Sequence, residues 1–286
     1  MLAIMNHGFT TTTTDSVRGE RSIDPMSRRP LAVPVIIAIN VLIFLAWQAS
    51  RGNEALEAVM AGNFLVSTNH LLAGHLWTLV TAAFSHIDLW HIALNMFVLW
   101  SFGVVLEKLW GTATFVVFYL TAAVVASASH CFVSSVLMGD PAMAALGASG
   151  AVSGLLLAFA FLFPKHKILV FGIIPVPALV GALAFVAIDL WGLFAQTRGG
   201  GIGIGHGAHL GGALCGFLFW ALYLKQRFPR RPTGRTVEMS MTPEEVQEFQ
   251  RLRRKLDLEG PDALTPKEKV FLEEIRERVM RAHEQS

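Results

Sequence analysis

Several apolar runs of about 20 residues each constrain this chain more than any other feature. Hydrophobic residues make up 53% of the 286 and charged residues only 15%, whereas roughly a quarter of an ordinary soluble domain is charged. The charges crowd into residues 15–30 and 225–286, so the runs between them are almost uncharged. Such runs are long enough to cross a bilayer as helices, and they lack the alternation of transmembrane β-strands. The sequence predicts an all-α polytopic membrane protein.

Turn and charge signals divide the apolar region, residues 31–228, into six predicted transmembrane helices. Glu107-Lys108 is expected to stop the second, and Pro175 and Pro177 break the regularity of the fifth. The predicted spans are Val33–Ala49, His86–Leu106, Thr112–Met138, Gly147–Phe163, Ile168–Phe194 and Ile202–Leu224.

The flanks of these spans predict the orientation. Basic residues precede the first span and follow the second, fourth and sixth. Positive flanks stay in the cytoplasm, so both termini are predicted to be cytoplasmic, in a bacterial plasma (inner) membrane. Residues 1–30 lack the apolar core of a cleavable signal and are expected to be a disordered leader. The net charge of +2 gives no case for a nucleic-acid partner.

The final segment, residues 237–286, is predicted to be a small cytosolic helical tail. Thr242 and Thr265 each begin a capping box with Pro at the first helical position. Two apolar stripes follow, formed by Val246, Phe249, Leu252 and Leu256 and by Phe271, Ile275 and Val279. We expect a solvated helical pair without a catalytic role, and its partner is unknown.

Four polar side chains fall at nearly one depth in the predicted bundle. His91, Ser149 and His209 each lie 16 positions before a charged residue at the cytoplasmic end of their span. At 1.5 Å per residue this is about 24 Å above the cytoplasmic edge, a few ångströms below the outer surface. Asn95 is one turn deeper on the face of His91. Polar groups in a bilayer usually face each other or a water-filled cavity, so these four are candidate site residues.

Structural alternatives exist for each candidate. Ser149 also fits small-residue helix packing, His209 a bond to a backbone carbonyl, and His91 with Asn95 an interhelical hydrogen bond. The glycines assigned to helix packing are Gly147, Gly150, Gly212 and Gly216. Close packing of this kind would let span six approach span four, so that His209 reaches Ser149.

The combination points to nucleophilic catalysis. A serine hydroxyl becomes a nucleophile when a histidine within hydrogen-bond reach takes its proton. Ser149 opens a helix, whose free N–H groups can stabilise an oxyanion together with His91 and Asn95. A zinc-protease HExxH motif is absent from the sequence. The aspartates Asp88, Asp140 and Asp189 are all placed near the outer boundary, so the sequence predicts a Ser–His dyad without a third member.

Residues 31–228 resemble the rhomboid intramembrane serine proteases. The resemblance rests on three motifs in the family's order on spans two, four and six, namely His86 to Asn95 (HxxxxHxxxN), Gly147 to Gly150 (GxSG) and Ala208 to Gly212 (AHxxG). It implies a nucleophile at Ser149, a general base at His209, and oxyanion contacts from His91, Asn95 and the Ser149 backbone N–H. The implied substrates are single-pass transmembrane proteins, cleaved near the outer membrane surface without metal or cofactor.

Two positions depart from the family pattern. Thr78 follows Trp77 where members often have Arg, which affects anchoring of the first loop. Ser153 stands four positions after the nucleophile, where some members stack an aromatic ring on the catalytic histidine. The orientation of His209 must then come from other packing.

Three rival functions remain open. A rhomboid-like protein without catalysis would bind transmembrane helices, although such proteins usually lose the serine or the histidine. A polar-lined channel gives no reason for a serine at a helix start. A metal or haem protein would use the histidines His86, His91, His206 and His209. His206 is otherwise expected in a loop at the outer surface, and Cys131 and Cys215 as core fillers.

Overall fold

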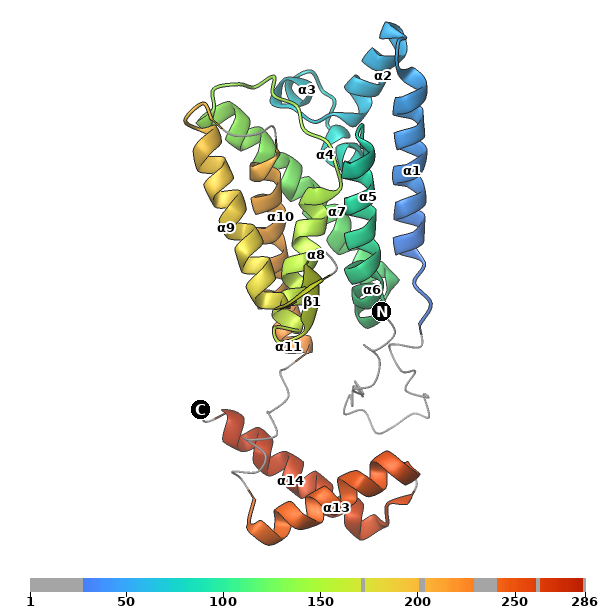
Figure 1. Cartoon of the computed structure of the whole chain (residues 1–286), viewed down its shortest axis with the longest axis vertical. Helices are drawn as coiled ribbons and strands as arrows, with labels where there is room; N and C mark the ends of the chain where they lie inside the picture. The colour runs from blue at the N-terminus through green and yellow to red at the C-terminus, as the bar shows by residue number, and fades with distance from the viewer. Residues whose placement is uncertain (1–27, 171–172, 201–203, 229–240, 261–262, 285–286) are drawn as a thin grey trace. The chain divides into compact units, whose positions relative to one another are not determined.

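The computed structural model describes residues 28–170, 173–200, 204–228, 241–260 and 263–284. The chain divides into two compact units, residues 1–227 and residues 228–286. The predicted leader falls almost entirely outside the described residues. The first unit is a bundle of long helices and the second is a pair of helices (Figure 1).

Helices account for most of the first unit. Those of its first half are α1 Ala32–Ser50, α2 Glu54–Phe64, α3 Thr68–Leu72, α4 Thr78–Thr81, the 3-10 helix η2 Ala82–Phe84, α5 Leu89–Val98, the π-helical η3 Leu99–Gly103 and α6 Val104–Trp110. Those of its second half are α7 Thr112–Phe132, the π-helical η4 Val133–Leu137, α8 Ser149–Leu162, α9 Ala178–Gln196, α10 His206–Phe219, the π-helical η5 Trp220–Leu224 and α11 Lys225–Arg227.

The polytopic membrane class is confirmed. Among the described residues, five helical segments are long and apolar enough to cross a membrane: Ala32–Ser50, Leu89–Trp110, Thr112–Leu137, Ala178–Gln196 and His206–Arg227. The segment predicted as span four, α8, is shorter at 14 residues. Most of its residues are buried among other helices, so α8 is the central element of the bundle.

The prediction that the second span stops at Glu107-Lys108 is wrong. The span continues to Trp110 and ends at Gly111, whose φ is +85°. The Glu107 side chain is buried and accepts the backbone N–H groups of Leu31, Ala32 and Val33 at 2.7–2.9 Å. These are donors that the start of helix α1 leaves unpaired, so the carboxylate caps α1 rather than ending its own helix.

The predicted start of the fifth span, at Ile168, is wrong by ten residues. Residues Lys167–Val170 and Ile174–Pro177 form an antiparallel hairpin, β1–β2, in which Ile168 pairs with Val176. A residue that precedes proline is pushed toward extended conformations, which favours a strand across Ile174–Pro177. Helix α9 therefore begins only at Ala178.

Helices α7, α8 and α10 pack together at the centre of the bundle. A Cβ at Gly212 would lie 1.8 Å from the carbonyl oxygen of Gly150, and one at Gly216 would lie 2.2 Å from that of Gly154. Only glycine permits so close a backbone approach between α8 and α10. In Figure 1, α9 lies beside α10 at one edge of this unit and α1 at the other.

The second unit consists of α13 Pro243–Glu259 and α14 Pro266–Glu284. The capping box at Thr242 is present, with Glu245 as its reciprocal partner. Leu252 and Ile275, one from each predicted stripe, are buried. Arg278 pairs with Glu245 at 2.8 Å, and this ion pair ties the two helices together.

Candidate active site

The predicted site residues come from the first two turns of α5 and the first turns of α8 and α10. Helix α5 starts after Asp88, whose carboxylate accepts the His91 N–H at 2.9 Å as an N-cap. His91 and Asn95 follow on one face, one turn apart. The Asn95 amide donates one hydrogen bond to the His91 carbonyl at 2.9 Å, so its second N–H is left for another acceptor.

The loop before α8 is held by backbone bonds on both sides of Gly147. The Gly147 N–H donates to the carbonyl of Ala82 at 2.8 Å, and the Ala148 N–H donates to Nε2 of His86 at 3.3 Å. Gly147 has φ +117°, and a Cβ there would lie 2.7 Å from the ring of His91. Gly147 therefore lies in a loop and not between helices, which corrects its assignment to helix packing.

Ser149 is the first residue of α8, and its Oγ lies 2.9 Å from Nε2 of His209. His209 is in the first turn of α10, one turn before Gly212. A Cβ at Gly150 would lie 2.5 Å from Cβ of Ala126 on α7 and 3.3 Å from the carbonyl oxygen of Ala208. The small residues at positions 150 and 212 thus let α8 and α10 approach until the serine and the histidine meet.

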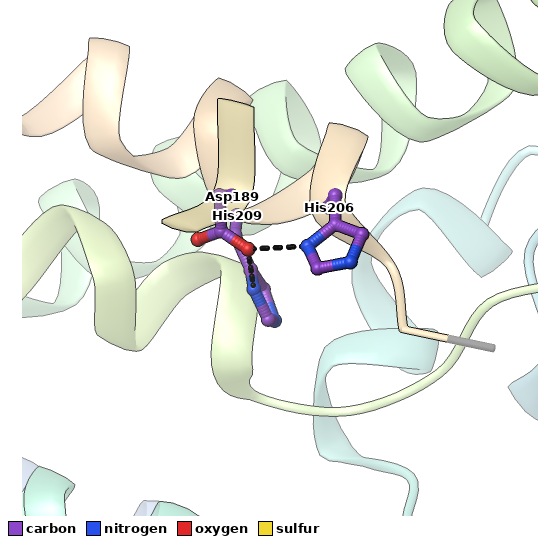
Figure 2. A group of neighbouring side chains, drawn as sticks. All are labelled: Asp189, His206 and His209. Carbon is purple, nitrogen blue, oxygen red and sulfur yellow. Dashed lines mark hydrogen bonds and ion pairs between the residues drawn. The ribbon is translucent and has the colours of Figure 1, made fainter. Parts of the chain in front are cut away.

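A third residue, which is not among the predicted site residues, contacts the histidine. Asp189 of α9 is buried, with 3% of its surface exposed, and its Oδ1 lies 3.0 Å from Nδ1 of His209. The same oxygen lies 2.6 Å from Nδ1 of His206 (Figure 2). The expectation that no acid faces the dyad is wrong, and so is the placement of His206 in a surface loop. His206 is the first residue of α10 and is buried.

The misplacement of Asp189 has a physical origin. The predicted fifth span ends at Phe194, only five residues after Asp189, so the acid is assigned to the boundary end of its helix. Helix α9 instead runs to Gln196, so Asp189 lies nearly two turns inside it. The usable signal was an acid within an apolar helix, because such residues are rare and normally have an intramembrane partner. Asp88 and Asp140 differ, since each accepts backbone N–H groups at a helix start or turn.

The aromatic neighbour of His209 also comes from α9. The Phe185 ring lies 5.6 Å from the His209 ring, centroid to centroid. Ser153, at the position where some rhomboids place an aromatic residue, donates its hydroxyl to the Ser149 carbonyl at 2.7 Å. Phe185 and Asp189 are one turn apart, so one face of α9 supplies both contacts on the imidazole.

A cavity of about 910 Å³ adjoins the pair. Ser149, His209, His91 and Asn95 all line it, together with Phe185. The structure therefore brings the four predicted site residues to one cavity, from three helices that begin at the same end of the bundle.

The segment before α5 is anchored without an arginine after Trp77. Thr78 is buried and donates its hydroxyl to the His75 carbonyl at 2.6 Å. The His75 ring stacks on Trp77 at 4.9 Å, and Val66 forms a backbone bridge with Ala145 of the loop that leads to the nucleophile.

The metal alternative is tested by one cluster. Among the described residues, the group of three possible ligands consists of Asp189, His206 and His209. Two ligands of one tetrahedral zinc, at bond lengths near 2.0 Å, lie about 3.3 Å apart. The 2.6 Å between His206 and Asp189 is a hydrogen-bond distance instead. The cluster fits hydrogen bonding better than metal ligation.

Comparison with known proteins gives one consistent family. Residues 73–226 match the Rhomboid domain. The chain is 31% identical over 215 residues to RHOMBOID-like protein 12, mitochondrial, of Arabidopsis thaliana, covering 71% of this chain and 61% of that protein. It is 33% identical over 188 residues to Rhomboid protein 1, mitochondrial, of Saccharomyces cerevisiae, covering 65% of this chain and 51% of that protein.

One bacterial relative is named as a protease. The chain is 30% identical over 191 residues to Rhomboid protease GluP of Bacillus subtilis, covering 66% of this chain and 34% of that protein. The alignments thus span between about a third and three fifths of these relatives. Because the domain match covers more than half of the 286 residues, this chain, an integral multi-pass membrane protein, belongs to the rhomboid family.

Proposed function

We propose that this chain is an intramembrane serine endopeptidase with Ser149 as nucleophile and His209 as general base. The observation that carries the proposal is the 2.9 Å contact between Ser149 Oγ and His209 Nε2 at the wall of a cavity. The serine oxygen attacks the peptide carbonyl carbon while its proton passes to Nε2. Nε2 then gives the proton to the leaving amine, and the peptide bond breaks to leave an acyl-enzyme on Ser149. Water next attacks the acyl carbon, with His209 again taking and returning the proton, and this releases the second product and the free serine.

The oxyanion formed in these steps needs donors. The N–H of Ser149 is among the first of α8, which have no intrahelical acceptor. The ring of His91, packed on Gly147, and the second N–H of the Asn95 amide are the side-chain candidates. Removal of one such donor typically lowers the rate about 10²–10³-fold.

The proposed substrates are single-pass transmembrane proteins, cut on the outer side of the membrane. A continuous transmembrane helix satisfies its backbone hydrogen bonds internally and keeps its carbonyls from attack. Glycine or proline near the bond lowers the cost of unwinding. Replacement of such residues by leucine in a substrate should slow cleavage strongly without changing its membrane insertion.

The orientation remains a proposal as well. The basic flanks support an orientation in which both termini lie on the side of the membrane where basic segments are retained. For a plasma-membrane protein this side is the cytoplasm. The prediction of a bacterial inner membrane receives no support from the relatives, several of which are named as mitochondrial.

The decisive experiment is covalent labelling of purified protein by a serine-directed fluorophosphonate, followed by mass spectrometry. Wild type should be labelled at Ser149, and Ser149→Ala should lose both labelling and cleavage of a transmembrane substrate while keeping its thermal unfolding temperature. Asn95→Ala should retain measurable activity. Ser127 is a buried serine on α7 that also lines the cavity. Its variant Ser127→Ala is the matched control and should be labelled like wild type. Labelling that persists in Ser149→Ala would contradict the assignment, and an unlabelled wild type would favour a binding protein without catalysis.

A further inference from the structure

The buried carboxylate of Asp189 faces two imidazoles through one oxygen. Oδ1 lies 3.0 Å from Nδ1 of His209 and 2.6 Å from Nδ1 of His206 (Figure 2). The Asp189 side chain is 4% exposed, that of His206 5%, and that of His209 12%. A buried carboxylate is stable only when donors replace its lost water, and the two ring N–H groups are such donors.

These contacts fix where the proton of His209 sits. A carboxylate only accepts, so Nδ1 of His209 must carry the hydrogen that faces Asp189. In the neutral ring Nε2 is then an acceptor, and Nε2 is the atom 2.9 Å from Ser149 Oγ. The serine can donate its proton only to an imidazole in this tautomer.

We propose that Asp189 is the positioning acid of a Ser149–His209–Asp189 triad. Asp189 holds His209 in the tautomer and orientation of a base for Ser149, and its charge stabilises the imidazolium that forms when the serine attacks. No bond forms to Asp189, and its own proton count does not change. This inference rests on the proposed function, in which Ser149 and His209 are the reacting pair.

His206 completes the arrangement from the other side. A Cβ at Gly192, one turn after Asp189 on α9, would lie 2.2 Å from Nε2 of His206, so the ring fills the space that this glycine leaves. The ring is therefore confined, and its Nδ1–H fixes the carboxylate oxygen that His209 uses. His206 is a positioning residue one step removed from the chemistry.

The alternative is that Asp189 only joins α9 to α10. Such a structural role lowers stability when the acid is removed, and any loss of activity would follow the loss of folded protein. A triad role lowers the rate of the chemical step in a protein that is still folded and still binds substrate. The two are separated by kcat and KM measured beside thermal unfolding.

The experiment compares wild type, Asp189→Asn, His206→Asn, His206→Ala and the control Leu190→Ala in detergent with a fluorogenic transmembrane substrate. Leu190 is the neighbour of Asp189 on α9 and is 55% exposed. Leu190→Ala therefore controls for the effect of any substitution on this helix that leaves the buried cluster unchanged. Asp189→Asn should lower kcat by about 10²–10⁴-fold with KM within threefold of wild type. His206→Asn, which keeps a donor near the position of Nδ1, should retain more activity than His206→Ala. Leu190→Ala should match wild type.

A second measurement does not depend on whether a variant of Asp189 folds. In wild type labelled with ¹⁵N-histidine, the His209 signals are assigned by their loss in His209→Gln, and Nδ1 should carry the hydrogen. Three outcomes overturn the triad: His209 in the Nε2–H tautomer, a kcat of Asp189→Asn within threefold of wild type, or a kcat that falls only in proportion to unfolded protein. A wild type without hydrolysis or labelling overturns the proposed function together with this inference, whereas an active Asp189→Asn overturns the triad alone.

Discussion

Gly212→Ala tests whether the backbone contact between α8 and α10 sets the catalytic geometry. The new methyl group would lie 1.8 Å from the carbonyl oxygen of Gly150, where ordinary contact begins at 3.4 Å. The atom that it meets belongs to the backbone of a central helix, so no side-chain rotation relieves the clash. The two helices must move apart.

The displacement can be related to the catalytic distance. Relief of the clash requires α10 to shift by about 1.5 Å, because carbon and oxygen need van der Waals separation. His209 lies one turn before Gly212 and moves with it, so its 2.9 Å contact with Ser149 should open to roughly 4 Å, beyond hydrogen-bond range. A misplacement of about 1 Å costs on the order of 10²-fold in rate, and overpacking costs about 1–3 kcal/mol of stability.

The assay is the second-order rate constant for fluorophosphonate labelling, measured with the unfolding temperature in the same detergent. Gly212→Ala should label at least 100-fold more slowly while a folded fraction remains. Gly200→Ala is the control, because its Cβ would lie at an ordinary 3.5 Å from its nearest neighbour, the Ala195 carbonyl. A Gly212→Ala protein that labels within threefold of wild type would refute the claim that this contact sets the distance between Ser149 and His209.

Two further predictions concern carboxylates outside the active site. Glu107→Gln should lower the free energy of unfolding by about 2–3 kcal/mol, because an amide cannot replace a charged acceptor of three N–H groups. Chemical denaturation in detergent measures this loss. An unchanged denaturation midpoint would contradict the capping role. In the tail, the Thr265 backbone N–H and then Lys255 lower the pKa of Glu268 to about 2. This carboxylate therefore stabilises the α13–α14 pair above about pH 4.5, and the contribution is lost as the pH falls toward 2. Amide exchange of α14 in the full chain, corrected for the intrinsic pH dependence, should lose protection in this window, and constant protection down to pH 2 would exclude the effect.

The sequence by itself determined the class of protein and the order of its helices. Apolar runs of about 20 residues predict membrane spans because the hydrocarbon layer requires that length, and the fixed rise per residue predicts a shared depth for His91, Ser149 and His209. Local signals also succeeded where the interaction is local, as in the capping box of Thr242 and Glu245, because such contacts join residues three apart.

Only the tertiary structure decided what the long-range partners are. Glu107 is read from the sequence as a charge that ends its helix, yet it caps α1 from more than 70 residues away. Asp189 meets His209 because one particular face of α9 turns toward α10, and the same face brings Phe185 to the ring. Hydropathy specifies that a helix is membrane-spanning but neither its rotation nor its exact ends. The sequence therefore does not reveal that Asp189, seven residues before the end of α9, faces the histidines of α10. Rotation is set by packing, here by the close approach of α8 and α10 at Gly212 and Gly216, where a Cβ would overlap the backbone of the other helix. Such a contact depends on two helices, so neither helix specifies it alone.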